Sequence, residues 1–266
     1  MHLFNSIVLP TESNIHTEHH KMRSTTRSKK YWWIWAGLIA LVGAVAFISY
    51  FNVDRTLTQE DRQYVQAFLP GVPADVAPTL SYEEQIELIK RAQAAVHAHT
   101  TGWNGIPEGQ PREPKQLFLS RDGLCYDRSR VLEKIFTYLG FTNRHLAMFQ
   151  RREGQPAVAT LVSSNVPSHA ISEVLTKKGW LLVDSNVLWV SLDKKGMPVS
   201  MPQLQKAHKL GKKHQWAAHP IGSDSVFYQN QCIPVYGLYS RHGRFYPPYV
   251  SGIPDYRIQA LWDNFE

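Results

Sequence analysis

The sequence predicts an α+β fold, with helices packed on an antiparallel sheet behind one N-terminal transmembrane helix. Apolar residues recur at three- and four-residue spacing between residues 81 and 139, which is typical of helices with a buried face. From residue 145 onward the apolar period changes to two, which is typical of strands. Helices that come before strands in the chain favour an α+β domain over an alternating α/β one.

Composition divides the 266 residues into five predicted segments. We expect a disordered basic tail over 1–30, a transmembrane anchor over 31–51 and a linker with a short helix over 52–80. The core domain is predicted over 81–190. An aromatic-rich C-terminal extension, packed on the core, is predicted over 191–266.

The segment 31–51 contains no charged residue and is long enough, at 1.5 Å per helical residue, to cross a hydrocarbon layer of about 30 Å. Trp32, Trp33 and Trp35 at its start fit an interfacial aromatic belt. Five cations precede the segment, which predicts a cytoplasmic N-terminus, an inner or plasma membrane anchor and a periplasmic or extracellular domain. A signal peptide cleaved after Ala44-Val45-Ala46 remains the alternative.

The formal net charge of +7 does not by itself indicate a polyanion-binding protein, because five of the cations flank the membrane segment. Lys206–Lys213 is the one dense basic stretch outside that region. It fits either contact with an acidic polymer or a solvated loop. Nothing in the sequence indicates nucleic-acid binding.

Cys125 stands at the start of a predicted core helix. Val131, Leu132, Ile135, Phe136 and Leu139 repeat at helical spacing, and Gly140 ends the pattern. Asp122 is the expected N-cap, and the positive end of the helix dipole favours a thiolate at Cys125.

Two alternatives to a nucleophilic Cys125 remain open. An inert buried cysteine is one of them. The other is a disulfide with Cys232, since the chain has two cysteines and an exported domain permits their oxidation.

Four strands are predicted, over 145–149, 157–162, 169–175 and 180–184, with a tight turn at 177–179. If Leu175 pairs with Trp180 across the hairpin, the numbers of every two paired residues sum to 355. His169 then pairs with Asn186, and Asp184 is its diagonal neighbour on the same sheet face. A sum of 353 places the two directly opposite each other. Either odd sum puts both side chains on one sheet face, where the carboxylate can orient the imidazole. A solvent-facing histidine and aspartate are the alternative.

These residues carry a resemblance to the transglutaminase-like superfamily, a branch of the papain-like cysteine enzyme fold, and the chain resembles a membrane-anchored, bacterial-type member of it. The pattern covers roughly residues 81–190. Its motifs are Gly123-Leu124-Cys125, with Ser129 one turn later, then His169-Ala170-x-x-Glu173-Val174 and Gly179-Trp180-x-x-x-Asp184. Ile171 and Ser185 depart from the family, which commonly has an aromatic residue and a proline at these places.

The resemblance implies a Cys125–His169–Asp184 triad that attacks a carbonyl and forms a thioester acyl-enzyme. Protease or amidase action on a protein or peptide substrate, or on an envelope polymer, is expected in preference to crosslinking. For the oxyanion hole, the backbone N–H of Cys125 is the first donor, and Gln116 and Trp103 are candidates for the second. The residue Asn186 is a weaker candidate than Asp184 for orienting the imidazole.

The C-terminal segment 219–266 is rich in aromatic residues, which favour a packed strap over a groove wall for a polymer. Arg241, His242 and Arg244 are candidate substrate contacts. No clustered acidic loop is present, so we predict no required metal and no cofactor. A non-catalytic scaffold for envelope or polysaccharide assembly and an acyltransferase on the same fold remain the alternative functions.

Overall fold

The computed structural model describes residues 26–107, 109–152, 154–161, 163, 166–239 and 255–265. The chain has two compact units, 1–47 and 48–266, and each is described by itself. Helix α1 (Thr26–Phe51) contains Tyr31–Tyr50, a stretch of 20 residues that is long and apolar enough to cross a membrane. A signal sequence has the same properties, so both alternatives from the sequence stand.

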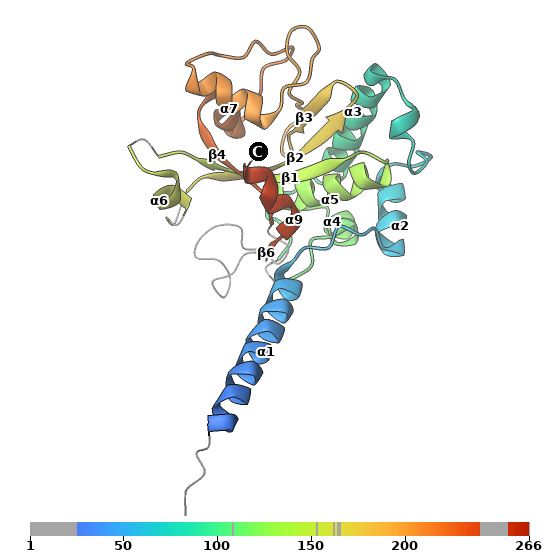
Figure 1. The fold of residues 1–266 in the computed structure, drawn as a ribbon. Helices are drawn as coiled ribbons and strands as arrows, with labels where there is room; N and C mark the ends of the chain where they lie inside the picture. The colour runs from blue at the N-terminus through green and yellow to red at the C-terminus, as the bar shows by residue number, and fades with distance from the viewer. Residues whose placement is uncertain are drawn as a thin grey trace, which may run out of the picture. The chain divides into compact units, whose positions relative to one another are not determined.

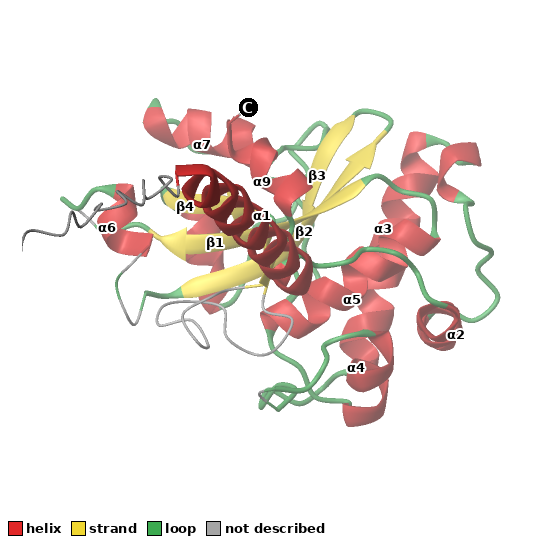
Figure 2. Ribbon diagram, turned by 60° about the horizontal axis from the view of Figure 1, so that its bottom comes forward, coloured by secondary structure: helices red, strands yellow, loops and turns green. Residues whose placement is uncertain are grey.

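The second unit confirms the predicted α+β fold, because an antiparallel sheet lies among helices (Figures 1 and 2). Four strands pair in the order β3–β2–β1–β4, and β5 pairs with β6. The strands are β1 (Asn143–Gln150), β2 (Ser168–Thr176), β3 (Gly179–Val183), β4 (Cys232–Tyr236), β5 (Leu238–Tyr239) and β6 (Asp255–Tyr256). The helices are α2 (Gln59–Phe68), α3 (Tyr82–His99), α4 (Pro114–Ser120), α5 (Cys125–Tyr138), α6 (Ala157–Leu161), α7 (Met201–Lys209), α8 (Val226–Gln229) and α9 (Ile258–Leu261), with 3₁₀ turns η1 (Ala77–Thr79), η2 (Ser223–Ser225) and η4 (Trp262–Phe265).

One face of the sheet is covered by α3 and α5 (Figure 1). Helix α3 begins with a capping box, in which the Ser81 and Glu84 side chains accept hydrogen bonds from each other's backbone N–H groups. The apolar faces of the two helices meet Val174 and Val183 of the sheet. Gly140 follows α5 with φ at +87°, and a Cβ atom there would lie 3.0 Å from the Asp75 Cα atom, so a glycine ends this helix as predicted.

The opposite face is covered by α7 and α8, together with Trp189 and Trp216 from the loops that flank α7. Met148, Ile171 and Leu182 point into this second core from three adjacent strands. The sheet is therefore buried on both faces, and residues of β2 alternate between the two cores. This burial excludes registers of the hairpin that are shifted by one residue, because such a shift would move each apolar set to the opposite face.

The hairpin of β2 and β3 has the first of the two predicted registers. Leu175 pairs with Trp180, and Ser172 pairs with Val183. The predicted strand over 157–162 is wrong, because Ala157–Leu161 forms the short helix α6. Its alternation of small and β-branched residues does not mark a buried face, since the Val158 side chain is 71% exposed. Pro156 before the segment instead suits the start of a helix.

A buried ionic network joins α5 to β5 and to the start of the second unit. The Glu133 carboxylate contacts Arg55 at 2.7 Å and Arg130 at 2.8 Å, and it accepts a hydrogen bond from Tyr239. Beside this network, the His145 ring stacks on Tyr239, and its Nδ1 atom lies 3.0 Å from the Ser129 hydroxyl. Burial lowers the pKa of His145 to about 4.

The burial of the His145 imidazole predicts that the protein loses stability in mild acid. Unfolded His145 takes up a proton near pH 6.5, whereas the folded form does so only near pH 4. The free energy of unfolding should therefore fall by about 3 kcal/mol between these two pH values. Urea unfolding of the chain and of His145→Gln at several pH values measures the slope. Equal slopes in the two proteins would contradict the assignment, because His97 and His208, whose pKa values burial also lowers, are present in both.

Candidate active site

Cys125 is the first residue of α5, as predicted, but its helix is capped differently from the prediction. The N-cap is Leu124, whose N–H donates to the Asp127 carboxylate at 2.8 Å. Asp122 instead accepts hydrogen bonds from the backbone and side chain of Asn104, at 2.7 and 2.8 Å. The predicted N-cap at Asp122 is therefore wrong, because this carboxylate holds the preceding loop rather than the helix.

Both cysteines are free thiols, so the disulfide alternative is wrong. Cys125 is partly buried against Ala147, Phe149 and Ala170 at the end of the sheet. Cys232 lies in the core on the other sheet face and accepts a hydrogen bond from Gln205. Burial raises the pKa of Cys232 to about 12, which makes it unreactive at neutral pH.

The hairpin brings His169 and Asp184 together. His169 is the second residue of β2, and Asp184 directly follows β3. The His169 Nε2 atom lies 3.1 Å from the Asp184 Oδ2 atom, and both side chains are fully buried. The diagonal relation that the register predicted is thus short enough for a hydrogen bond.

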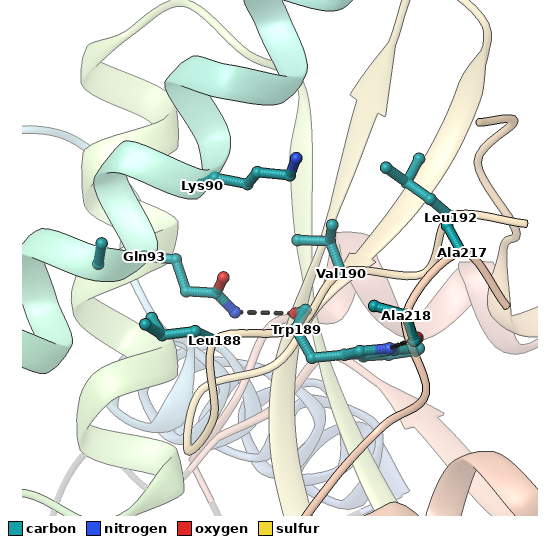
Figure 3. A pocket seen from close by; sticks show the side chains of 9 residues that line it. Lys90, Gln93, Leu188, Trp189, Val190, Leu192, Ala217 and Ala218 are labelled. Atoms are coloured by element: carbon teal, nitrogen blue, oxygen red, sulfur yellow. Dashed lines mark hydrogen bonds between the residues drawn. The ribbon is translucent and has the colours of Figure 1, made fainter.

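Asp184 is held by several further hydrogen bonds. Tyr228 of α8 donates its hydroxyl to Asp184 Oδ2 at 2.5 Å, and the backbone N–H groups of Asn186 and Val187 donate to Oδ1. The Gln93 side chain from α3 donates to the backbone carbonyls of Asp184 and Trp189, the second of which is drawn in Figure 3. The orientation of this carboxylate is therefore fixed from both sides of the sheet.

The charge on His169 follows from this arrangement. Burial alone would lower the pKa of His169, but the negative charge of Asp184 and its hydrogen bond outweigh burial, and the Cys125 thiol acts in the same direction. The pKa of His169 consequently lies well above its usual 6.5. Burial raises the pKa of Asp184, yet His169 and Tyr228 more than offset this, and the carboxyl stays ionised.

A second carboxylate, Asp224, faces the other nitrogen of the imidazole. The Asp224 Oδ2 atom lies 3.6 Å from His169 Nδ1 and accepts a hydrogen bond from Asn186 Nδ2 at 2.7 Å. The Asn186 Oδ1 atom in turn accepts from Arg128 at 3.1 Å. Asn186, which the sequence ranked below Asp184 as an orienting residue, thus supports the site through its neighbours.

Arg128 is a buried cation one helical turn after Cys125. Its guanidinium donates to Thr100 and Gly102 as well as to Asn186. Among the residues that the structure describes, Arg128 forms no salt bridge. Burial lowers the pKa of Arg128, and the charge of Cys125 acts against that effect. A buried positive charge of this kind favours a negative sulfur nearby.

The two candidates for the second oxyanion donor lie in different places. Trp103 is 57% exposed, and the Arg128 guanidinium carbon lies 4.2 Å from its ring centroid. Gln116 is on α4, and its buried Oε1 atom has no hydrogen-bond partner among the described residues. Trp103 is therefore tied to the helix of Cys125, whereas the Gln116 Oε1 atom is bonded to no described residue.

Of the remaining candidates, Arg241, His242 and Arg244 lie outside the described residues. Four aromatic residues of the C-terminal segment are buried, which favours the packed strap: Phe227, Tyr228, Tyr236 and Tyr239. Within the described ranges there is no cluster of three or more histidine, cysteine, aspartate or glutamate side chains arranged to hold a metal ion.

The Tyr228 hydroxyl offers a test of how Asp184 is held. Tyr228→Phe removes a buried hydrogen bond to a charged acceptor, so the free energy of unfolding should fall by about 1.5–3 kcal/mol. Urea unfolding at pH 7 measures the change. Tyr64→Phe is the control, since the Tyr64 hydroxyl makes no hydrogen bond to any described residue and its loss should change stability by less than about 0.5 kcal/mol. Equal effects of the two changes would show that the Tyr228–Asp184 bond does not stabilise the site.

Comparison with known proteins adds little to this geometry. No protein-family model matches the chain, and no curated protein matches it. A solved structure from Cytophaga hutchinsonii, described as a "Putative Cysteine Protease", is similar over 56% of this chain and 48% of its own, with 12% identity and a TM-score of 0.27. The chain thus spans about half the length of that protein. At this identity and TM-score, the likeness decides neither the fold nor the chemistry.

Proposed function

We propose that this protein is a membrane-anchored, exported cysteine enzyme of the transglutaminase-like type, which acts on amide bonds. The observation that carries the proposal is the fully buried His169 imidazole. It is bonded through Nε2 to Asp184, and its pKa is raised by Asp184 and, to a smaller extent, by the Cys125 thiol. A nucleophile, a base and a carboxylate that orients the base are the three groups that acyl transfer through a covalent intermediate requires.

In this reaction the Cys125 sulfur attacks the carbonyl carbon of the substrate, and the carbon–nitrogen bond breaks. The proton on His169 passes to the departing amine, and a thioester forms on Cys125. His169 then removes a proton from water as the water attacks the thioester, which releases the carboxylic acid and restores the thiol. Asp184 stabilises the imidazolium and fixes its orientation throughout.

The surroundings of the three residues support this chemistry. Arg128 places a buried positive charge one turn from the sulfur, and α5 directs its N-terminal N–H groups toward that end. The Cys125 N–H is the first oxyanion donor in this proposal. Trp103 and Gln116 remain the candidates for the second donor, and the contact between Trp103 and Arg128 favours Trp103.

The location of the enzyme is also part of the proposal. The apolar helix and the cations before it support a single-pass anchor with a cytoplasmic N-terminus. The catalytic unit then lies in the periplasm or outside the cell, where water abounds and hydrolysis is favoured over crosslinking. Protein or peptide substrates of the cell envelope fit this location.

The reaction class is tested with p-nitrophenyl acetate, a small acyl donor. We expect a burst of one nitrophenolate per protein, with one acetyl group on Cys125 in the mass spectrum, followed by slow turnover in water. Added glycinamide tests acyl transfer: a rate that rises with amine concentration, with acetylated glycinamide as product, would replace the hydrolase with an acyltransferase. A protein that gives neither a burst nor an acetylated Cys125 would contradict the enzyme proposal and favour the non-catalytic scaffold.

A further inference from the structure

Two pairs of lysines that are distant in the chain meet at one place on the surface of the second unit. Lys194 and Lys195 lie in the turn after β3, and Lys212 and Lys213 follow α7. Backbone hydrogen bonds hold the two segments together: Lys194 N–H donates to the Gln215 carbonyl at 3.0 Å, and Ala217 N–H donates to the Leu192 carbonyl at 2.8 Å. An antiparallel bridge between Asp193 and Trp216 adds to this.

These four lysines line one cavity of about 310 Å³. The full lining comprises Asp193, Lys194, Lys195, Ala207, Lys212, Lys213, His214 and Gln215. Asp193 is its one acidic member, and the Asp193 Oδ1 atom already accepts hydrogen bonds from the backbone N–H groups of Lys195 and Met197. The cavity therefore presents more positive charge than its own carboxylate neutralises.

The charge of this surface has no partner in the described part of the chain. None of the four lysines forms a salt bridge there, whereas Lys90, Lys115 and Lys178 each pair with a glutamate. Residues 194–223 hold six lysines and no acidic residue, while the whole of 31–266 has a net formal charge of only +4. Without this segment, the rest of 31–266 would carry −2, so the positive charge is concentrated in this segment, and four of its six lysines line the cavity.

The surface extends toward the candidate active site. A second cavity, of about 250 Å³, shares Lys213 and His214 with the first and is also lined by Tyr228. Tyr228 is the residue that donates its hydroxyl to Asp184. We call Lys194, Lys195, Lys212 and Lys213 the lysine surface. Its cavity adjoins the second cavity through Lys213 and His214, and the second cavity reaches Tyr228, which supports the triad.

We propose that the lysine surface binds an acidic polypeptide segment and, resting on the proposed function, that this segment belongs to the substrate. Lysine ammonium groups are point charges that pair with carboxylates in many orientations. The lining contains no arginine, which bidentate phosphate recognition favours. Its one aromatic ring, His214, is stacked on Trp216, and the lining contains no Trp, Tyr or Phe on which a base or sugar would stack. Its one apolar residue, Ala207, offers no anchor for lipid.

Binding is tested on the full chain carrying Cys125→Ala, in a nonionic detergent, by the fluorescence anisotropy of a fluorescein-labelled oligoglutamate peptide. Lys194→Gln, Lys212→Gln and Lys213→Gln together should weaken binding by about tenfold. The matched control combines Lys90→Gln, Lys115→Gln and Lys178→Gln, which removes the same charge from paired lysines elsewhere. It should change binding by less than about twofold, since net charge acts weakly across distances beyond a Debye length.

Two results would overturn the inference. Equal loss of binding in the two triple variants would show that overall charge, and not this surface, holds the peptide. Polygalacturonate, duplex DNA and phosphatidylglycerol vesicles are compared with unlabelled oligoglutamate as competitors, at equal concentrations of negative charge. If one of them displaces the probe at a lower charge concentration than oligoglutamate does, that competitor identifies the class of partner instead. The test is separate from the proposed reaction, because it uses a protein without the nucleophile. A failed acylation experiment therefore leaves the binding result unchanged.

Discussion

Replacing Cys125 with alanine is expected to abolish the nitrophenolate burst and all stoichiometric labelling by acylating probes, while the fold persists. Cys125 is partly buried at the first residue of α5, so the change removes one sulfur without opening a large cavity. Loss of the nucleophile leaves no group that can hold the acyl intermediate, and turnover should fall by roughly 10⁴-fold or more. Stopped-flow absorbance and intact-mass spectra measure the two effects, and circular dichroism reports the fold.

The matched control is the other cysteine of the chain. Cys232 is buried 107 positions later in a different core, with a pKa raised to about 12, and Cys232→Ala should leave the burst at one equivalent. Labelling that persists at full stoichiometry in Cys125→Ala would mean that another residue is acylated. In that case Cys125 would not be the nucleophile, and its role would be limited to packing in the core.

Asp184→Asn is expected to reduce turnover by roughly 10⁴-fold with little change in geometry. The amide is nearly isosteric with the carboxylate and can still accept from the N–H groups of Asn186 and Val187. It carries no charge with which to stabilise the His169 imidazolium, which is present before attack and forms again when His169 takes a proton from water. Steady-state rates with p-nitrophenyl acetate measure the loss, and a thermal melt checks that the protein remains folded.

Asp224→Asn provides the comparison, because Asp224 faces the other nitrogen of the same ring. Its Oδ2 atom lies 3.6 Å from Nδ1, longer than a hydrogen bond, and its side chain is 22% exposed. We expect this change to lower turnover by about tenfold or less. A larger loss in Asp224→Asn than in Asp184→Asn would identify Asp224 as the residue that orients the imidazole.

The sequence predicted the parts of the fold that are encoded locally. The glycine at 140 and the tight turn at 177–179 each specify a boundary through their own chemistry. The hairpin register followed from the turn and from burial on both faces of the sheet. The error at 157–162 arose where an alternating segment exposes its apolar Val158 and buries the polar Thr160, since periodicity predicts a strand only when the apolar face is covered.

The candidate site could be predicted from the sequence only in part, namely where local turn chemistry brings its residues together. His169 and Asp184 flank one hairpin, so their proximity follows from the register. Tyr228 and Asp224 come 44 and 40 residues after Asp184, and no periodic pattern connects them to the hairpin. Arg128 was within reach of sequence reasoning, because a charged residue three positions after Cys125 on a buried helix must lie near the thiol.

The protonation state of His169 tests the central claim most directly. In ¹⁵N-histidine-labelled protein, with the signal assigned through His169→Gln, His169 should remain an imidazolium well above pH 6.5, while His145 in the same spectra titrates near pH 4. Asp184→Asn should lower the pKa of His169, because the carboxylate charge that offsets burial is gone. A His169 that is neutral at pH 6.5 in the unmodified chain, as a merely buried histidine would be, would contradict the account.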